Sequence, residues 1–321
     1  MSVEAGPVKI RCCAASGCRS AGSETLHRAL VAARDAAGIG GDAMVIKSVG
    51  CLRLCGRGPL VACDGDAGTQ LYGGVPPEQA RELVTALSHP SEESDGTDGA
   101  KASPLAGHRL DLEHPFFRLQ HAVVLEGCGQ LDPESIQDAI AHGAYTQLRS
   151  VLLSRSPQEV REEIRRSGLR GRGGAGYPTG LKWDTVALQP PGPRFVVCNG
   201  DEGDPGAFMD RSVMEGDPHR LLEGMAIAAY AVGADRGYIY VRAEYPLAID
   251  RLRLALKQAR QKGLLGNGIA GTPFSLHLEV RVGAGAYVCG EETALLHSIA
   301  GERGTPRPRP CLLYTSDAAD E

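Results

Sequence analysis

The spacing of hydrophobic and polar residues divides the first 88 residues of this chain into short regular elements. Alternating apolar positions predict strands, and apolar positions three or four residues apart predict helices. The expected strands are residues 8–12, 43–49 and 60–63 and a strand after a turn at 72–75; the expected helices are residues 22–37 and 77–87. This β-α-β-β-α order with short connections predicts a compact α/β domain over residues 1–88.

Residues 89–107 break this pattern, because they are polar and acidic and show no periodicity. Such a composition predicts a disordered linker, and we place a domain boundary there. Beyond it, within residues 108–310, segments with the helical spacing of apolar residues alternate with segments that have the strand spacing. The expected helices are 132–141, 143–153, 157–166, 217–232, 246–262 and 290–299, and the expected strands are 194–198 (buried), 237–242 and 275–282. This alternation predicts an α/β domain with a mostly parallel sheet covered on both faces.

Composition narrows the classes of function. A net charge of -5 and the absence of a basic block with interleaved aromatic residues argue against a nucleic-acid partner. The longest apolar run, near residues 224–232, falls well short of the roughly 20 residues that cross a bilayer. Residues 1–10 lack the charged start and apolar core of a secretory signal. We therefore expect a soluble, cytoplasmic protein without direct membrane insertion.

The chain has ten cysteines, and half of them lie within the first 55 residues. Because structural disulfides are uncommon in a reducing compartment, clustered thiols there indicate a metal centre. Cys13 and Cys18 form one pair and Cys51 and Cys55 another, which suits a tetrathiolate site for zinc or for an iron–sulfur cluster. Neighbouring glycines, which let the backbone turn around the sulfurs, favour the cluster. Cys12 adjoins Cys13 and could replace it as a ligand.

A glycine-rich segment at residues 167–183 is the most informative part of the chain. Bare backbone N–H groups beside Arg170, Arg172 and Lys182 suit an anionic, flat ligand such as a nucleotide or flavin, whereas a ligand-free linker would not carry aromatic residues and cations. The segment contains a literal G-x-G-x-x-G at Gly171, Gly173 and Gly176. That motif marks a dinucleotide fold only between a strand and a helix, and here a predicted helix precedes it.

Two further segments have polar or glycine-rich sequences where predicted strands end. Residues 199–211 (N-G-D-E-G-D-P-G-A-F-M-D-R) follow a strand, where carboxylates suit the hydroxyls of a ribose or ribityl chain; an acidic cation-binding loop is the alternative. Residues 283–293 (G-A-G-A-Y-V-C-G-E-E-T) form a glycine turn before a helix. The alternative for this second segment is an ordinary loop in which Glu291 and Glu292 favour the helix dipole.

The N-terminal cysteine pattern resembles the thioredoxin-like 2Fe-2S ferredoxin domain, whose pattern is C-x4-C followed by G-C-x3-C-x2-G-P. Residues 50–59 (G-C-L-R-L-C-G-R-G-P) reproduce the second half of that pattern, and the resemblance covers about residues 8–88. It implies a 2Fe-2S cluster held by Cys13, Cys18, Cys51 and Cys55.

The glycine segment and the two later segments together resemble the flavin module of the NADH-binding FMN/iron–sulfur subunit of respiratory complex I. The same module occurs in the diaphorase subunits of NAD-dependent hydrogenases and formate dehydrogenases, and the resemblance covers about residues 110–310. It implies a Rossmann-like domain that binds FMN and NAD(H). The implied binding residues are Gly171, Arg172, Gly173, Gly174, Gly176, Tyr177, Lys182, Asn199, Asp201, Glu202, Asp204, Tyr287, Gly290, Glu291 and Glu292.

This resemblance also implies the reaction and the partners. No catalytic acid or base is required, because hydride passes between the two cofactors and electrons then leave one at a time to iron–sulfur centres. The implied partners are other subunits of an electron-transfer complex, including iron–sulfur subunits and a molybdopterin or nickel–iron subunit, through which the protein would be peripheral to a membrane. The alternative is a redox-sensing or nucleotide-binding module without diaphorase activity.

Residues 311–321 (C-L-L-Y-T-S-D-A-A-D-E) have no place in that family pattern and resemble a translated sequencing-library transposon adapter. We therefore expect the natural gene to continue past residue 310 and this tail to be an artefact. The resemblance then implies that a 4Fe-4S domain lies in the missing region, and that the fragment is inactive by itself.

Overall fold

The computed structural model describes residues 7–65, 68–88, 105–173 and 175–307, which form two compact units. Unit 1 comprises the chain up to Ser135 together with Glu215–Asp217, and unit 2 comprises Ile136–Met214 and the chain from Pro218 onward. The expected linker (89–107, described only from 105) and the expected artefact tail (311–321) lie almost wholly outside the described residues. No helix in the described ranges is long and apolar enough to span a membrane.

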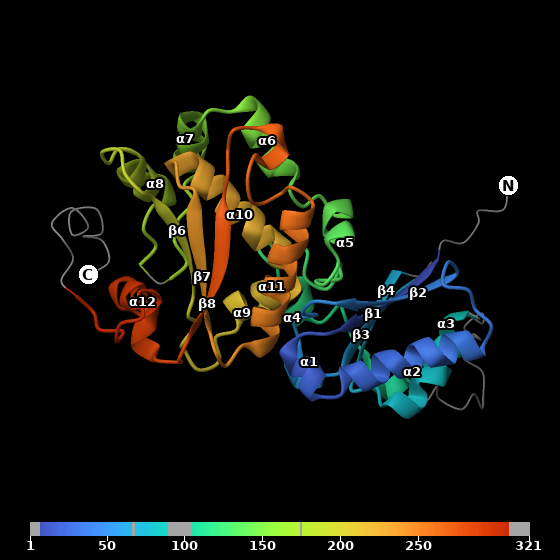
Figure 1. The fold of residues 1–321 in the computed structure, drawn as a ribbon. Helices are drawn as coiled ribbons and strands as arrows, with labels where there is room; N and C mark the ends of the chain where they lie inside the picture. Colours follow the sequence, from blue (N-terminus) through green and yellow to red (C-terminus); the bar gives the residue numbers. More distant parts are fainter. Residues whose placement is uncertain (1–6, 66–67, 89–104, 174, 308–321) are drawn as a thin grey trace, which may run out of the picture. The chain divides into compact units, whose positions relative to one another are not determined.

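Unit 1 is built on a five-stranded sheet in the order β2-β1-β3-β4-β5. β1 (Val8–Cys13) and β2 (Met44–Val49) are parallel, whereas β3 (Leu60–Gly65), β4 (Gly68–Gly73) and β5 (Arg109–Leu110) join antiparallel. The helices α2 (Ser23–Ala36) and α3 (Ala80–Ser88) pack together and bury apolar side chains with the sheet (Figure 1). This arrangement confirms the thioredoxin-like class that the sequence predicted.

Two details of unit 1 differ from the sequence prediction. β4 ends at Gly73, so the turn at residues 72–75 follows a strand and does not precede one. Residues 105–135 belong to unit 1, because Leu105 is buried in its core and β5 extends its sheet through the pairs Leu71–Leu110 and Tyr72–Arg109. The domain boundary that we expected at residue 108 therefore differs from this division. Short helices complete the unit: α1 (Ser16–Ser20), η1 (Cys55–Arg57), η2 (Pro77–Gln79), η3 (Ala106–His108) and α4 (Pro115–Arg118).

Unit 2 contains a parallel sheet of β6 (Phe195–Gly200), β7 (Arg236–Arg242) and β8 (His277–Gly283), in that order. The long helices α10 (Pro218–Val232) and α11 (Pro246–Gln261) pack against it and form most of the core (Figure 1). The remaining elements are α5 (Ile136–Ala141), α6 (Thr146–Ser154), α7 (Pro157–Ser167), α8 (Thr179–Ala187), α9 (Met209–Gly216), η4 (Ile269–Gly271), η5 (Tyr287–Gly290) and α12 (Glu292–Ile299). The last two residues of α9, Glu215 and Gly216, belong to unit 1. The expected parallel sheet is confirmed.

The second face of this sheet is less covered than expected. Phe195 and Val197 of β6 are partly exposed, and the Phe195 ring stacks on Tyr238 at a centroid distance of 6.2 Å. Tyr240 lies on the same face but is buried, because Cys289 and Leu295 pack over it. Within the described residues, therefore, the chain covers one face fully and the other only near α12, and β6 is not the buried strand that the sequence predicted.

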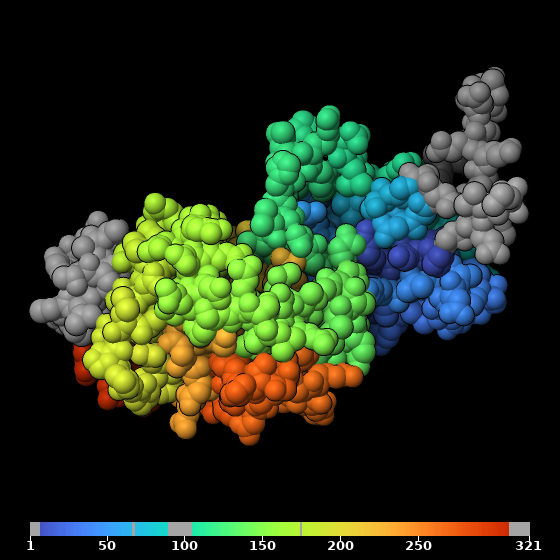
Figure 2. Space-filling model, turned by 90° about the horizontal axis from the view of Figure 1, so that it is seen from above, coloured from blue at the N-terminus to red at the C-terminus, as the bar shows by residue number. Residues whose placement is uncertain are grey.

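The glycine-rich segment follows the helix α7, as predicted, but it also leads into α8, a helix that the sequence analysis did not predict. α7 begins at a capping box, in which the Ser156 side chain accepts from the Glu159 N–H and the Glu159 carboxylate accepts from the Ser156 N–H. It ends at Gly168, whose φ of 67° is a left-handed conformation that suits glycine. α8 then packs against α7 at Gly180, where an added Cβ would lie 2.6 Å from the Arg165 Cα. Figure 2 shows the yellow-green residues of α7 and α8 side by side on one face of unit 2.

Candidate functional site

Three segments far apart in the sequence meet in unit 2 beyond the carboxyl ends of its parallel strands. Asn199, near the end of β6, donates from Nδ2 to the Gly290 carbonyl at 2.8 Å. Tyr287 donates from its hydroxyl to Asp204 Oδ1 at 3.0 Å, and Lys182 Nζ lies 3.4 Å from Glu292 Oε2. The structure therefore brings together the three segments that the sequence singled out, at the edge where open α/β sheets bind ligands.

The glycine loop offers bare backbone on its surface. It is closed by the Gly171 N–H, which donates to the Tyr177 carbonyl at 2.8 Å, and by Arg170, which donates to the Gly176 carbonyl at 3.0 Å. An added Cβ at Gly173 would meet nothing within 4 Å, and at Gly171 the nearest atom would be 3.7 Å away. Because no side chain of the described residues fills this space, a ligand can approach the main chain closely. Arg172 is exposed, Tyr177 is partly buried and Gly174 lies outside the described residues.

Asp201 is the most unusual side chain of the acidic segment. Its side chain is only 2% exposed, its Oδ1 lies 4.0 Å from Arg242 Nε, and its Oδ2 has no hydrogen-bond partner in the described part of the chain. Burial raises the pKa of this carboxyl. The turn of the third segment approaches it, since a Cβ at Gly290 would lie 3.8 Å from Oδ2. A buried acceptor without a donor fits a ligand hydroxyl at this position.

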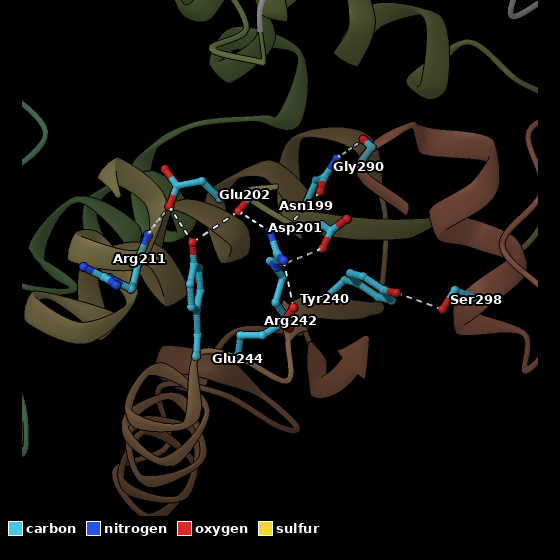
Figure 3. A network of polar contacts seen from close by, with 10 residues as sticks. Asn199, Asp201, Glu202, Arg211, Tyr240, Arg242, Glu244, Gly290 and Ser298 are labelled. Carbon is cyan, nitrogen blue, oxygen red and sulfur yellow. Dashed lines mark hydrogen bonds and ion pairs between the residues drawn. The ribbon is translucent and has the colours of Figure 1, made fainter. Parts of the chain in front are cut away.

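Glu202 makes contacts within the chain that the sequence did not predict. Its carboxylate accepts from the backbone N–H groups of Asp210 and Arg211, at 3.1 and 3.2 Å, and so caps the start of α9. Figure 3 shows the contact with Arg211. Its carbonyl accepts from Arg242 Nη1 at 2.8 Å and from the Tyr245 hydroxyl at 3.2 Å. The side chain is therefore directed at a helix terminus, and the main chain beside it is held by two side chains.

Arg242 and Tyr245 were not among the residues predicted from sequence. Arg242 is the last residue of β7, and it also binds Glu244 Oε1 at 2.8 Å (Figure 3). The signal that could have found it is the rule used for β6, that side chains following a parallel strand line the ligand edge of the sheet. Tyr245 has no such signal, because only the packing shows that it reaches Glu202.

The third segment combines a structural and a candidate binding residue. Glu291 caps α12, since its Oε2 accepts from the Ala294 N–H at 2.9 Å and from Thr293 Oγ1 at 2.6 Å. Tyr287 is 70% exposed, and a Cβ at Gly203 would lie 2.8 Å from its ring. The hydrogen bond to Asp204 raises the pKa of Tyr287. Glu291 thus stabilises the turn, whereas Tyr287 and Asp204 present polar groups on the surface.

The four predicted cysteine ligands gather in unit 1 at the ends of β1 and β2. Cys13, Cys18 and Cys51 are buried and Cys55 is exposed. Cys13 lies close enough to Cys18 and Cys51, and Cys51 close enough to Cys55, for each thiol to shift the pKa of its neighbour. The contact with Cys18 is the main cause that raises the pKa of Cys13 to about 12, and the same contact lowers the pKa of Cys18. The sequence therefore identified four thiols that the fold brings into one cluster.

The backbone around these thiols lies close to the sulfur atoms. Within the described ranges, no three or more His, Cys, Asp or Glu side chains are arranged to hold a single metal ion. The Arg53 N–H donates to Cys51 Sγ at 3.3 Å, and Gly58 lets the backbone lie close to Cys18. Such N–H contacts stabilise thiolate ligands.

Cys12 is excluded from this group by strand alternation. Cys12 packs in the core with Cys63, on the opposite face of β1 from Cys13. Burial, the main cause, raises the pKa of Cys12 to about 12 and also raises that of Cys63. The structure thus separates an inert buried pair from the four clustered thiols.

The comparison with known protein families agrees with the geometry of unit 2. Residues 164–316 match the model of the Complex1_51K family, described as the Nuo51 FMN-binding domain. This part of the chain is therefore similar to that family, which confirms the resemblance to the flavin module. We expected the family pattern to stop at residue 310, but the match extends six residues further, to residue 316.

Individual relatives belong to two kinds of complex. The chain is 53% identical over 191 residues to the HndC subunit of the NADP-reducing hydrogenase of Solidesulfovibrio fructosivorans, covering 60% of this chain and 39% of that protein. It is 51% identical over 176 residues to a subunit of the NADH-quinone oxidoreductase of Aquifex aeolicus, covering 55% and 41%. A solved NAD+-reducing [NiFe]-hydrogenase aligns with 99% of this chain and 53% of its own, at 25% identity and a TM-score of 0.49. The chain spans about 40% of the length of these two curated relatives.

Proposed function

We propose that unit 2 binds FMN and a nicotinamide nucleotide, and that the protein is an NADH-oxidising or NAD-reducing flavoprotein subunit. The observation that carries this proposal is the buried Asp201 carboxylate, whose Oδ2 lacks a partner in the described residues, at the point where the three segments meet. The match of residues 164–316 to an FMN-binding domain supports the same conclusion.

The residues divide by the part of the ligand that each suits. The backbone of Gly171 and Gly173, with Arg172 and Lys182, would hold the phosphate, because bare N–H groups and cations suit an anion. Asn199 and Asp201 would bind ribityl hydroxyls. Gly174, Gly176, Gly290 and Glu291 would shape the loops around the flavin, and Glu202 would act through its cap on α9.

The nicotinamide nucleotide would lie on the more exposed side of this site, at Tyr177, Asp204, Tyr287 and Glu292. Bound FMN would supply the redox chemistry, both two-electron exchange with a nicotinamide and one-electron exchange with iron–sulfur centres. The protein's part is to orient the two rings and to exclude water. No side chain need act as a general acid or base.

Unit 1 would hold a 2Fe-2S cluster on Cys13, Cys18, Cys51 and Cys55, as their mutual contacts and the N–H donor to Cys51 support. We propose that this cluster exchanges electrons with the flavin and with other iron–sulfur subunits of a larger complex. A molybdopterin or nickel–iron subunit encoded beside this gene would name that complex.

The test uses the protein encoded by the full gene, reconstituted with FMN, iron and sulfide. We expect stoichiometric FMN, the absorption of a 2Fe-2S cluster, and reduction of ferricyanide by NADH or NADPH. The Asp201→Ala variant should lose flavin, whereas Glu279→Gln, an exposed change on β8, should retain it. Flavin binding without nicotinamide oxidation would contradict the diaphorase proposal and favour a binding or sensing module, and a protein that binds no flavin would overturn both.

A further inference from the structure

A short buried acidic segment of unit 1, Glu215–Asp217, contacts the first cysteine-bearing loop. Glu215 is 1% exposed, its Oε2 accepts from the Ser16 N–H at 2.9 Å, and its Oε1 accepts from Ser16 Oγ at 2.5 Å. Ser16 lies between Cys13 and Cys18 in the sequence, 199 residues away from Glu215. One carboxylate therefore binds the middle of the loop that joins two of the four thiols.

The same segment contacts the second loop through glycine backbone. Gly50, which precedes Cys51, would place an added Cβ 2.6 Å from the Gly216 Cα. On Gly216 an added Cβ would lie 2.7 Å from Cys128 Sγ, so neither glycine can carry a side chain without movement of its neighbours. Glu215 and Gly216 thus touch the two loops that carry the cysteine pairs.

The local sequence explains why the first loop needs an acceptor from elsewhere. Ser16 is the first residue of α1, and the preceding residue, Ala15, has no side chain that can cap the helix. The first N–H groups of a helix have no partner within it, and a carboxylate is a strong acceptor for them. Glu215 supplies that acceptor, and it also binds the Ser16 hydroxyl.

We propose that Glu215 is a positioning residue for the iron–sulfur cluster, acting through Ser16 on the loop that carries Cys13 and Cys18. This inference rests on the cluster assigned to unit 1 under the proposed function. The carboxylate would do two things: hold the loop in one conformation and place a negative charge beside the cluster. Because reduction adds an electron, a nearby negative charge lowers the reduction potential.

The test compares variants of the full chain with the cluster reconstituted by iron and sulfide. In Glu215→Gln the side-chain oxygen can still accept from Ser16 while the charge is lost, so we expect the cluster to be retained and its midpoint potential to rise. In Glu215→Ala and Ser16→Ala contacts to the loop are lost, so we expect a changed electron paramagnetic resonance spectrum of the reduced cluster and faster loss of iron. Glu82→Gln, an exposed change of equal charge on α3, is the control and should match the wild type.

The outcomes separate this inference from the proposed function. A wild-type protein that takes up no 2Fe-2S cluster would refute the cluster and the role of Glu215 together. A wild-type protein with a cluster, and Glu215 variants with unchanged potential and spectrum, would refute only the role of Glu215. Should Glu215→Ala fail to fold, the potential of Glu215→Gln and the spectrum of Ser16→Ala decide the question.

Discussion

At the scale of single residues, burial decides the protonation of His219. The imidazole is 0% exposed; its Nδ1 lies 2.8 Å from the Tyr145 hydroxyl and its Nε2 lies 3.2 Å from Gln258 Oε1. Because Gln258 Oε1 can only accept, Nε2 carries the proton and Nδ1 accepts from Tyr145. Burial lowers the pKa of His219 below its ordinary value of 6.5. The neutral ring is therefore part of the folded core.

This pKa gives a dependence of stability on pH. Because the pKa of His219 is lower in the folded than in the unfolded state, the neutral imidazole contributes its full stability above pH 6.5. That stability is lost as the pH falls from 6.5 through the pKa of the folded state. We expect His219→Gln to lower stability by about 1–3 kcal/mol at pH 7.5 and to flatten the decline toward pH 5. Thermal unfolding across pH measures both, with the exposed His277→Gln as control. An unchanged slope in His219→Gln would contradict this account.

Asp201 is also buried, but its carboxylate belongs to the candidate ligand site and not to the core. Removing it in Asp201→Ala should weaken FMN binding about 10–100-fold, since a hydrogen bond to a charged group contributes about 1.5–3 kcal/mol. The ligand-free protein should lose little stability, because Oδ2 has no partner among the described residues and Oδ1 makes only a long contact of 4.0 Å with Arg242 Nε. Titration of flavin fluorescence and thermal unfolding of the ligand-free protein check the two halves. Equal flavin affinity in Asp201→Ala and the wild type would remove Asp201 from the site.

At the scale of elements, the glycine-rich segment serves two purposes that its composition does not distinguish. Gly180 is buried where α7 and α8 pack, whereas Gly173 lies in the exposed loop between them. The packing of the two helices requires glycine at position 180, whereas no contact of the described residues requires it at position 173. Close approach of a bound ligand would explain the glycine at position 173.

Two identical substitutions separate these purposes. Gly180→Ala should destabilise the protein by about 1–3 kcal/mol, because its methyl group would lie 2.6 Å from the Arg165 Cα, despite the better helix propensity of alanine. Gly173→Ala should leave stability unchanged and lower FMN affinity about tenfold, by about 1.4 kcal/mol. Thermal unfolding and flavin titration of both variants give the comparison. Gly173→Ala with unchanged affinity would show that no ligand approaches that backbone.

At the scale of the whole molecule, the two compact units predict two separable cofactor sites. Cys13→Ser should lose the iron and sulfide of unit 1 while FMN binding to unit 2 persists. Cys12→Ser should keep its iron, because Cys12 faces the core with Cys63 and not the other thiols. Iron, sulfide and flavin analysis of the purified variants measures these outcomes. Loss of iron in Cys12→Ser but not in Cys13→Ser would reverse the assignment.

Much of the fold could be predicted from sequence because the signals are local. The capping box at Ser156, the strand alternation of β8 and the apolar spacing of α2 each depend on residues close together in the chain. The domain division was less accessible. β5 joins the sheet of unit 1 by pairing with β4, which lies more than 35 residues earlier in the chain. A strand of two residues is too short to show an alternation of apolar and polar positions, so the sequence gives no sign of this pairing.

The candidate site was predictable to the same extent and for the same reason. The composition of the glycine-rich segment and of the two segments that follow strands predicted where a ligand would bind. All three segments lie together in unit 2. The role of each carboxylate could not be predicted from the sequence. Asp201 and Glu202 are adjacent in sequence, but Asp201 is buried toward Gly290 while Glu202 caps α9.

The sequence by itself determined the classes of element, the two sets of chemistry and their order along the chain, because caps, periods and motif spacings act over a few residues. Only the tertiary structure decided which side chains meet. It separated Cys12 from Cys13, bound Glu202 to the start of α9, and placed Glu215 against Ser16 across 199 residues of chain. The physical reason is that such contacts depend on how whole strands and helices pack, and no local pattern records that packing.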